Sequence, residues 1–350
     1  MQIRPRRSLV AAVTAAAAAL AISASAAPAH SNPDHVDPAA MERGADPKVA
    51  RIVGNKIVDG ERSLQVRRAN LHMELWRTAG GYVVVDNVRH EKRHFRLTSV
   101  SKTGERTVLA RPEWLAGSAV SLDRRTLAWG NAKGDLAEPT VVNVVDPDTG
   151  VAKGRRTFPG QANVVAVTRS RVLLTKEAKI GPDSTWWWNF RRDSLHKVSD
   201  WTAKRADLRH DRVVLMPKSS VPSRCHRVAA LSKPGVALWR SCGITPYAWS
   251  PNGERALSTH FYFDYPGTDR WVVVDGSTGK RGAKVNGRLE WDVAWEDNRH
   301  FLTLAQSDQG KAAVIRCTVR AKCERASKVW DIPVDLDAYF VAPPVVLASN

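Results

Sequence analysis

Two segments of the sequence gather side chains that could bind an anionic or carbohydrate ligand. Basic groups pair with carboxylate or phosphate oxygens, and aromatic rings offer flat faces for stacking. The basic segment contains Arg89, His90, Lys92, Arg93 and His94, and the aromatic segment contains His260, Tyr262 and Tyr265. Together they predict a binding surface for an anionic polymer or a glycan. The alternative interpretation is that these are ordinary solvent-exposed loop residues without a binding role.

A run of three tryptophans is the second candidate site. Successive side chains of a strand point to opposite faces, so Trp186 and Trp188 would share one face while Trp187 takes the other. Trp186 and Trp188 could therefore form a stacking platform for a sugar ring or a base. Packing of bulky aromatic side chains between neighbouring sheets is the alternative.

The sequence contains none of the common linear motifs of enzymes. It has no Gly-x-Ser-x-Gly elbow, no His-Glu-x-x-His pair, no phosphate-binding loop and no EF-type calcium loop. Asp146, Asp148 and Asp275 fall in turn sequences, where aspartate is favoured on conformational grounds. Asp264 and Asp292 remain as carboxylates that a folded chain could bring together. We therefore expect neither a cofactor nor a bound metal, and we favour a protein that is not an enzyme.

The elements that must position these residues repeat along the chain. Turn sequences with Thr-Gly or Pro-Gly recur at Gly104, Gly150, Gly235 and Gly279, at intervals of 46, 85 and 44 residues. The middle interval is close to two steps of about 43 residues, and a period of roughly 40–45 residues with several strands per unit is typical of a β-propeller. The clearest unit, residues 246–286, contains four short β-type runs, which is one propeller blade.

The two ends of the chain extend this repeat. The last turn of each unit falls near residues 104, 150, 193, 235, 279 and 320, and one further step toward the N-terminus leads to Asp59-Gly60, a strong hairpin dipeptide. This hairpin would supply the outer strands of a seventh blade, with inner strands from residues 337–341 and 345–347. We therefore predict an all-β fold, a seven-bladed β-propeller closed by N- and C-terminal strands. Six blades with both ends peripheral is the alternative.

The four cysteines fit the same turns. Cys225 and Cys242 flank the predicted turn near residue 234 symmetrically, and Cys317 and Cys323 flank the predicted turn at residue 320. Opposed residues of an antiparallel pair lie within disulfide reach. We therefore predict the disulfides Cys225–Cys242 and Cys317–Cys323. A zinc site built from all four cysteines is the competing interpretation, and it lacks any Cys-x-x-Cys pair.

The first 29 residues have the pattern of a secretory signal peptide. Arg4, Arg6 and Arg7 precede an uncharged apolar stretch over residues 9–22, and small-x-small cleavage sequences follow it. That stretch is shorter than the roughly 20 residues that span a bilayer. We predict a signal peptide over residues 1–29, a flexible linker over 30–49 and a single β-propeller domain over 50–350. No second apolar stretch is long enough to cross a membrane, so we expect a secreted, extracellular protein associated with the cell envelope.

The charge of the chain suggests the kind of partner. The formal net charge is +18 at pH 7, and removal of the predicted signal peptide leaves +15. Such a surface attracts anionic partners. The basic residues are spread along the chain, which argues against a specific nucleic-acid site. We expect a monomer whose partner is a protein or an anionic cell-envelope polymer.

Some of the turns resemble a known repeat. Residues 250–255 have the sequence Ser-Pro-Asn-Gly-Glu-Arg, which resembles the Ser-Pro-Asp-Gly-x-Arg turn of TolB-like propellers, and residues 121–125 are a weaker copy. Through segments 75–84, 238–242 and 323–327, the chain resembles exported TolB-like or WD-repeat-like β-propeller proteins of actinobacteria. That resemblance covers nearly all of residues 50–332 and implies a fold and export, but no activity. Three units lack the Ser-Pro-Asp-Gly turn, and no Gly-His…Trp-Asp signature is present at repeat spacing.

These observations favour an exported, non-catalytic β-propeller that binds a protein partner or an anionic envelope polymer at one mouth of its central channel. The basic and the aromatic segments both fall between the second and third strands of a unit, and such loops gather at one mouth. The alternative is a glycan-active hydrolase or lyase with carboxylates in the central channel. An enzyme would show inward-facing Asp or Glu with displaced pKa values in a deep, funnel-shaped pocket, whereas a binding protein would show a shallow basic and aromatic rim.

Overall fold

Short strands rich in β-branched and aromatic residues, separated by tight turns, build this protein. The computed structural model describes residues 35–89, 94–133, 138–177, 183–217, 225–260, 267–332 and 345–349. These residues contain 28 strands and no helix, so within the described ranges no helix could cross a membrane. The all-β architecture is consistent with the β-propeller predicted from the sequence.

The strands form five sheets, of which the first joins the two ends of the chain in the order β3-β2-β1-β28-β4-β5-β6-β7. Its strands are β1 (Arg51–Val53), β2 (Lys56–Asp59), β3 (Arg62–Gln65), β4 (Leu71–Arg77), β5 (Gly81–Arg89), β6 (His94–Ser101), β7 (Arg106–Ala110) and β28 (Val345–Ser349).

Three sheets of four consecutive strands follow. The first contains β8 (Trp114–Val120), β9 (Leu127–Ala132), β10 (Thr140–Val145) and β11 (Ala152–Phe158). The second contains β12 (Gln161–Val167), β13 (Arg171–Glu177), β14 (Ser184–Asn189) and β15 (Ser194–Ser199). The third contains β16 (Thr202–Asp207), β17 (Arg212–Met216), β18 (His226–Ala230) and β19 (Lys233–Ser241).

The fifth sheet is continuous because its longest strand, β23, serves two groups of strands. The sheet contains β20 (Ile244–Trp249), β21 (Arg255–His260), β22 (Gly267–Asp275), β23 (Arg281–Trp295), β24 (His300–Gln306), β25 (Lys311–Thr318), β26 (Cys323–Arg325) and β27 (Trp330–Asp331). One end of β23 pairs with β22, and its other end pairs with β24. Strand β23 is therefore the outer strand of one group and the inner strand of the next.

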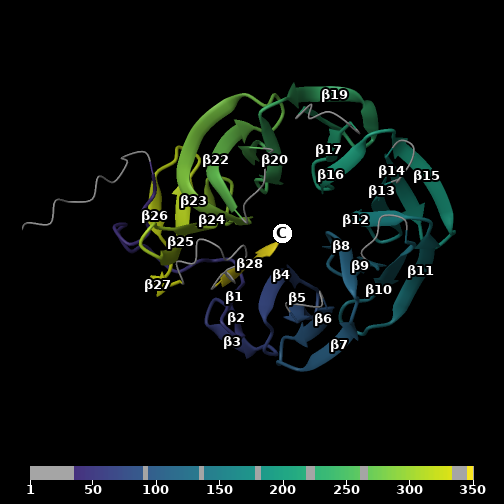
Figure 1. Cartoon of the computed structure of the whole chain (residues 1–350), viewed down its shortest axis with the longest axis horizontal. Coiled ribbons are helices and arrows are strands. Elements are labelled where there is room, and N and C mark those ends of the chain that lie inside the picture. Colours follow the sequence, from purple (N-terminus) through teal and green to yellow (C-terminus); the bar gives the residue numbers. More distant parts are fainter. Residues whose placement is uncertain are drawn as a thin grey trace, which may run out of the picture. The chain divides into compact units, whose positions relative to one another are not determined.

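The groups stand around a common axis, with the first strand of each group nearest to it and the last at the periphery (Figure 1). Neighbouring groups pack face to face. One core cluster, for example, joins Ala119, Val142 and Phe158 of one sheet to Leu174 and Trp188 of the next. A close approach at Gly117 helps this packing, because an added Cβ there would lie 2.3 Å from the Val164 carbonyl oxygen.

Strand β28 connects the two ends of the chain. It pairs antiparallel with β1, where Val346 lies opposite Ile52, and parallel with β4, where Ala348 lies opposite Leu75. The predicted turn at Gly60 joins β2 to β3, with φ of 59°. Strand β1, and not residues 337–341, takes the place beside the innermost strand. A short hairpin from β1 to β2 closes with less loss of chain entropy than a distant return, and residues 337–341 lie outside the described residues.

Most of the predicted turns lie where the repeat placed them. Gly104, Gly150 and Gly279 all have positive φ and lie between third and fourth strands of their groups. The predicted turn at Pro234-Gly235 is wrong, because the chain turns before β19 begins at Lys233. Proline has no N–H to donate to a ladder, and the register shifts there, with Ala230 opposite Lys233 but Ala229 opposite Ala237.

The four cysteines form the two predicted disulfides, Cys225–Cys242 and Cys317–Cys323. Cys317 and Cys323 are directly opposed on β25 and β26. Cys225 and Cys242 lie just beyond the last pair of β18 and β19, His226 with Ser241. Each disulfide therefore fastens an outermost strand to its neighbour.

Residues 35–49 precede the first strand and run against the last sheet. Val36 N–H donates to the Asn286 carbonyl (2.9 Å), and the guanidinium of Arg316 donates to the carbonyls of Ala45 (3.1 Å) and Asp46 (3.0 Å). This part of the expected linker contains no strand, only two isolated bridges. It follows the outside of the sheet through backbone contacts.

The pairing of β28 makes a prediction about stability. Leu347 is 2% exposed, so Leu347→Ala should lower the free energy of unfolding by about 2–5 kcal/mol. The same change at Leu238, which is 48% exposed on β19, should lower it by less than about 0.5 kcal/mol. Urea unfolding of both variants measures the difference, and equal losses would contradict the role assigned to β28.

Candidate functional site

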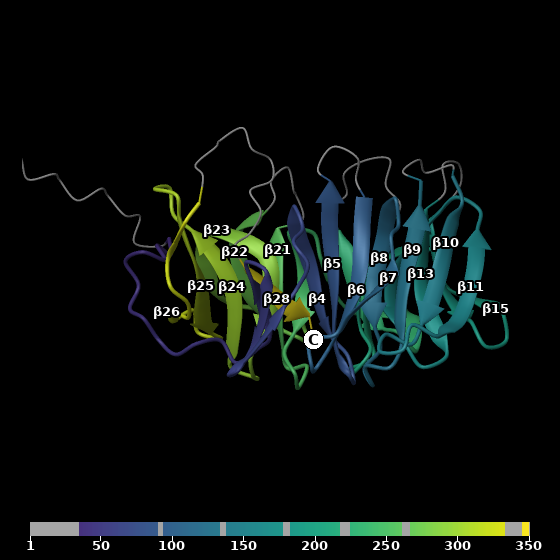
Figure 2. The ribbon, with the colours of Figure 1, turned by 90° about the horizontal axis from the view of Figure 1, so that it is seen from below.

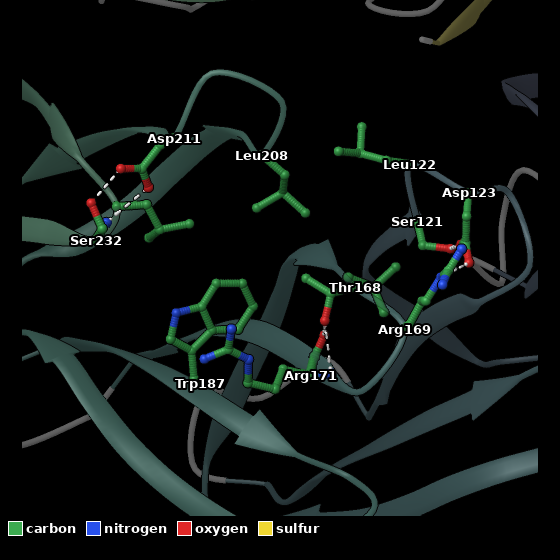
Figure 3. A pocket seen from close by; sticks show the side chains of 12 residues that line it. Ser121, Leu122, Asp123, Thr168, Arg169, Arg171, Trp187, Leu208, Asp211 and Ser232 are labelled. Carbon is green, nitrogen blue, oxygen red and sulfur yellow. Dashed lines mark hydrogen bonds and ion pairs between the residues drawn. The ribbon is translucent and has the colours of Figure 1, made fainter.

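The turns between first and second strands lie at one face of the ring, here called the turn face (Figure 2). A cavity of about 590 Å³ is lined by residues of these turns (Figure 3). Three consecutive groups of strands contribute to it, and Trp187 on β14 completes it. Its lining residues are Ser121, Leu122, Asp123, Val167, Thr168, Arg169, Arg171, Trp187, Leu208, Asp211, Leu231 and Ser232. We call this cavity the apolar cavity.

Two aliphatic side chains of the apolar cavity are accessible to a ligand. Leu122 is 53% exposed although it lies in a tight turn, and Leu208 is half-buried beside it. Trp187 is only 8% exposed, and the guanidinium of Arg171 covers its ring at 5.0 Å from the centroid. The floor therefore presents aliphatic side chains to a ligand, with only a small part of the indole.

Two carboxylates stand at opposite sides of this cavity, and both are held by the protein (Figure 3). The carboxylate of Asp123 accepts from Arg169 Nε at 2.6 Å and from Ser121 Oγ at 2.5 Å. Asp211 accepts from the Ser232 N–H (2.9 Å) and from its hydroxyl. Burial acts to raise the pKa of Asp123, but the hydrogen bonds from Ser121 and Arg169 outweigh it and lower the pKa. Asp123 is thus a stable anion, fixed in place.

A second cavity, of about 410 Å³, adjoins the first and shares Asp123 and Arg169 with it. Its remaining lining residues are Arg125, Thr126, Lys153, Phe190 and Arg191. Four cationic side chains and one carboxylate therefore line it. We call it the basic cavity.

Carboxyl groups also lie on the innermost strands near the axis. Glu74 on β4 accepts from Trp76 Nε1 at 2.9 Å and from the hydroxyl of Ser118 on β8. Asp292 on β23 accepts the backbone N–H of Leu347 on β28. These bonds connect strands of neighbouring groups around the axis.

The pKa values of these inner carboxyls are all raised. Burial raises the pKa of Asp292 to about 8; the Leu347 N–H opposes this shift, while the charges of Glu290 and Glu74 add to it. Burial likewise raises the pKa of Glu290 to about 7, and it raises the pKa of Glu74 against the hydrogen bonds from Ser118 and Trp76. Burial is thus the main cause of the upward pKa shift in all three groups.

This pattern does not suit acid–base catalysis. A glycoside hydrolase needs one carboxyl group that holds a proton and a second that stays ionised. The pKa values of Glu74, Glu290 and Asp292 are all shifted upward, and each carboxyl group already accepts a hydrogen bond from the protein.

Among the described residues, no group of His, Cys, Asp and Glu is arranged to hold a metal ion.

Only the ends of the predicted basic and aromatic segments are described, and they lie at the strand ends opposite to the turn face. The positions His90, Lys92, Arg93, Tyr262 and Tyr265, and the side chain of Arg89, fall outside the described residues. His94 begins β6 and His260 ends β21, both half-buried, and these strands belong to different sheets. Most of both segments lies outside the described residues, so binding there stays a prediction.

The three tryptophans divide between the two faces of β14. Trp188 is 1% exposed and packs edge-on against Phe158 (5.8 Å between ring centroids) and Phe190 (6.1 Å). It is a core residue and not a stacking platform, because the neighbouring sheet covers it. Trp186 is half-buried between the Nζ atoms of Lys176 (5.5 Å) and Lys197 (6.0 Å).

The residues of the apolar cavity escaped the sequence analysis. The alternation of side chains places Trp187 on the face opposite to the predicted stacking platform. Arg169 lies in a turn without a repeat signature, and Arg171 begins the strand that follows it. One signal was present in the sequence: Leu122 stands where the repeat turn has proline. Leucine has none of the turn-favouring chemistry of proline, so this position departs from the repeat.

Comparisons with known proteins identify the fold alone. No protein family matches the chain, and no curated protein is similar to it. An acylaminoacyl peptidase from Pyrococcus horikoshii is 10% identical with a TM-score of 0.53; the match covers 78% of this chain but 47% of the peptidase chain, about half its length. A chain of the Mitotic Checkpoint Complex is 10% identical with a TM-score of 0.52, over 86% of this chain and 88% of that one.

TolB from Acinetobacter baumannii is also similar, at 12% identity and a TM-score of 0.42, over 80% of this chain and 63% of TolB. That likeness is too low to carry an argument. The two higher TM-scores support an all-β, propeller-type architecture, and none of the three matches assigns a ligand.

The raised pKa of Asp292 predicts how stability depends on pH. The unfolded chain ionises an aspartate near pH 4, so between about pH 4 and about pH 8 the folded protein holds a proton that the unfolded chain has lost. Stability should therefore fall as pH rises through this window. Asp292→Asn keeps an acceptor for Leu347 N–H and should reduce that fall by at least about 1 kcal/mol.

Urea unfolding at about pH 5 and about pH 8.5 measures this pH dependence. Asp308→Asn is the matched control, since the Asp308 side chain is 95% exposed. If Asp292→Asn lost as much stability between these two pH values as the unmodified protein does, Asp292 would not be the group that causes the fall.

Proposed function

We propose that this chain is an exported, non-catalytic, seven-bladed β-propeller that binds a partner at the turn face. Six groups of strands follow one another from β4 to β26, and β28 with β1, β2 and β3 makes a seventh. Pairing of β28 with both β1 and β4 supports a ring closed by the two ends of the chain.

The single observation that carries the binding proposal is the apolar cavity. Turns from three consecutive groups converge on it, and Leu122 stays 53% exposed at its edge. Exposed apolar surface with a polar rim is a mark of interaction sites. Such a rim is present in Asp123, Arg169 and Asp211.

Export and partner class are proposed from the sequence together with the disulfides. A leader-like segment over residues 1–29 and two disulfides fit an oxidising compartment. The mature domain would begin after the leader, with residues 35–49 held against the last sheet. The net positive charge favours a protein with an acidic surface or an anionic envelope polymer as partner, and we propose a monomer.

The glycan-active enzyme remains a second candidate because of one observation, the raised pKa values of Glu290 and Asp292 near the axis. It is the weaker candidate, since these groups do not separate into a proton donor and an ionised partner. Release of a cleaved glycan by the purified protein, abolished by Glu290→Gln, would overturn the binding proposal.

A panel of probes tests the binding proposal: a glycan array, soluble anionic polysaccharides and a displayed peptide library. Leu122→Glu places a charge at the edge of the apolar cavity. It should weaken the affinity for any probe that binds the unmodified protein at least about tenfold, which is about 1.4 kcal/mol of binding free energy.

Leu238→Glu makes the same change on β19, at a site 48% exposed and outside both cavities, and it should leave binding unchanged. If no probe binds, or if both variants weaken binding alike, the turn face is not the binding site.

A further inference from the structure

We infer that the apolar and basic cavities together form one site for an extended acidic peptide, with an apolar side chain in the first cavity and a carboxylate in the second. This inference rests on the proposed binding function and names its ligand. It follows from the wall that the cavities share, from the shape of the apolar floor and from the distribution of charge.

The wall between the cavities is a single ion pair. Asp123 and Arg169 line both of them, joined at 2.6 Å. The side chain of Arg169 is 78% exposed, whereas that of Asp123 is 19% exposed. The ion pair that the cavities share is thus an exposed guanidinium on a fixed carboxylate. A peptide that spans both cavities could hydrogen-bond to the terminal nitrogens of that guanidinium, because Asp123 is bonded through Nε.

The floor of the apolar cavity selects against a sugar ring. Stacking of a sugar needs an open aromatic face, but Trp187 is 8% exposed and Arg171 lies over its ring. Val167 is 1% exposed, so the accessible aliphatic surface comes from Leu122 at the edge of the cavity and from half-buried Leu208. Contact between this surface and an apolar side chain of a ligand would remove apolar area from water, which is favourable.

The basic cavity supplies cations that the protein does not neutralise. Arg125 and Arg191 are exposed, and neither forms an ion pair with any of the residues whose placement is described. Lys153, by contrast, pairs with Asp146 at 3.0 Å. Two arginines without a carboxylate partner, near a third in Arg169, suit one carboxylate of a ligand.

The two cavities differ in charge, and this difference favours a peptide over a uniform polyanion. The apolar cavity holds Asp123 and Asp211 beside Arg169 and Arg171, so its charges balance. A polymer with a charge on every unit would bring its charges against Asp211. A peptide can place an apolar residue there and acidic residues only beside Arg125 and Arg191.

Selection from a random displayed peptide library on the intact protein tests this inference. Retained peptides should combine Asp or Glu with a nearby Leu, Ile, Val, Met or Phe. Replacing their acidic residues by the amides should weaken binding at least tenfold, and so should the double variant Arg125→Glu/Arg191→Glu. Higher salt should weaken binding as well.

The control is the double variant Lys102→Glu/Arg106→Glu, which changes the net charge by the same amount as Arg125→Glu/Arg191→Glu. Lys102 lies in the β6–β7 turn and Arg106 begins β7; both are exposed and lie outside both cavities. It should weaken binding much less than the Arg125/Arg191 variant. Equal losses in the two double variants, or retained peptides without acidic residues, would overturn the inference.

The remaining outcomes separate this inference from the proposed function. Binding of an anionic polysaccharide that Leu122→Glu abolishes, with no peptide retained, would refute the peptide and leave a binding site at the turn face. Peptides could also bind equally well to the unmodified protein, to Leu122→Glu and to the Arg125→Glu/Arg191→Glu variant. This result would refute both the proposed site and the inference.

Discussion

The pairing of the C-terminal strand with both β1 and β4 is the constraint on which the rest of the structure depends. Without β28, the inner edges of two neighbouring groups would present unpaired backbone N–H and C=O groups to each other. The side chains from Val345 to Ala348 are at most 3% exposed, so the strand also fills the core between those groups. Asp292 adds a hydrogen bond from the next inner strand. Because each group packs on its neighbours, a defect at this junction would loosen the spacing of all of them.

That spacing in turn creates the candidate site. No single group of strands contains the apolar cavity; it exists because three groups bring their turns to one mouth at a fixed separation. The close approach of β8 to β12 at Gly117 sets part of this separation. The repeated features of the chain thus hold the ring together, and the residues that depart from the repeat supply the chemistry. Such departures include Leu122 in place of a turn proline, and Arg125 and Arg191, which line the basic cavity.

The fold was predictable from the sequence because local chemistry repeats. Glycines at 104, 150 and 279 adopt the positive φ that their turns require, and they recur at a readable interval. The Cys317–Cys323 disulfide followed from the turn at residue 320. Cys225–Cys242 forms as predicted although its turn lies before Lys233, because the bulge on β19 still brings the strand ends into register. Two features were not predictable in this way. The bulge at Pro234 shifts a turn by local backbone chemistry that the interval does not encode. The cavities depend on side chains from different groups, whose proximity is set by the ring and not by distance along the chain.

Hydrogen–deuterium exchange of the protein, free and with the probe of the binding panel that binds most strongly, would show whether a partner binds at the turn face. We expect new protection in the turns over residues 121–126, 167–171 and 208–211, where binding would cover exposed backbone. Protection confined to the opposite face, at the ends of β5, β6 and β21, would contradict it and return the site to the basic and aromatic segments.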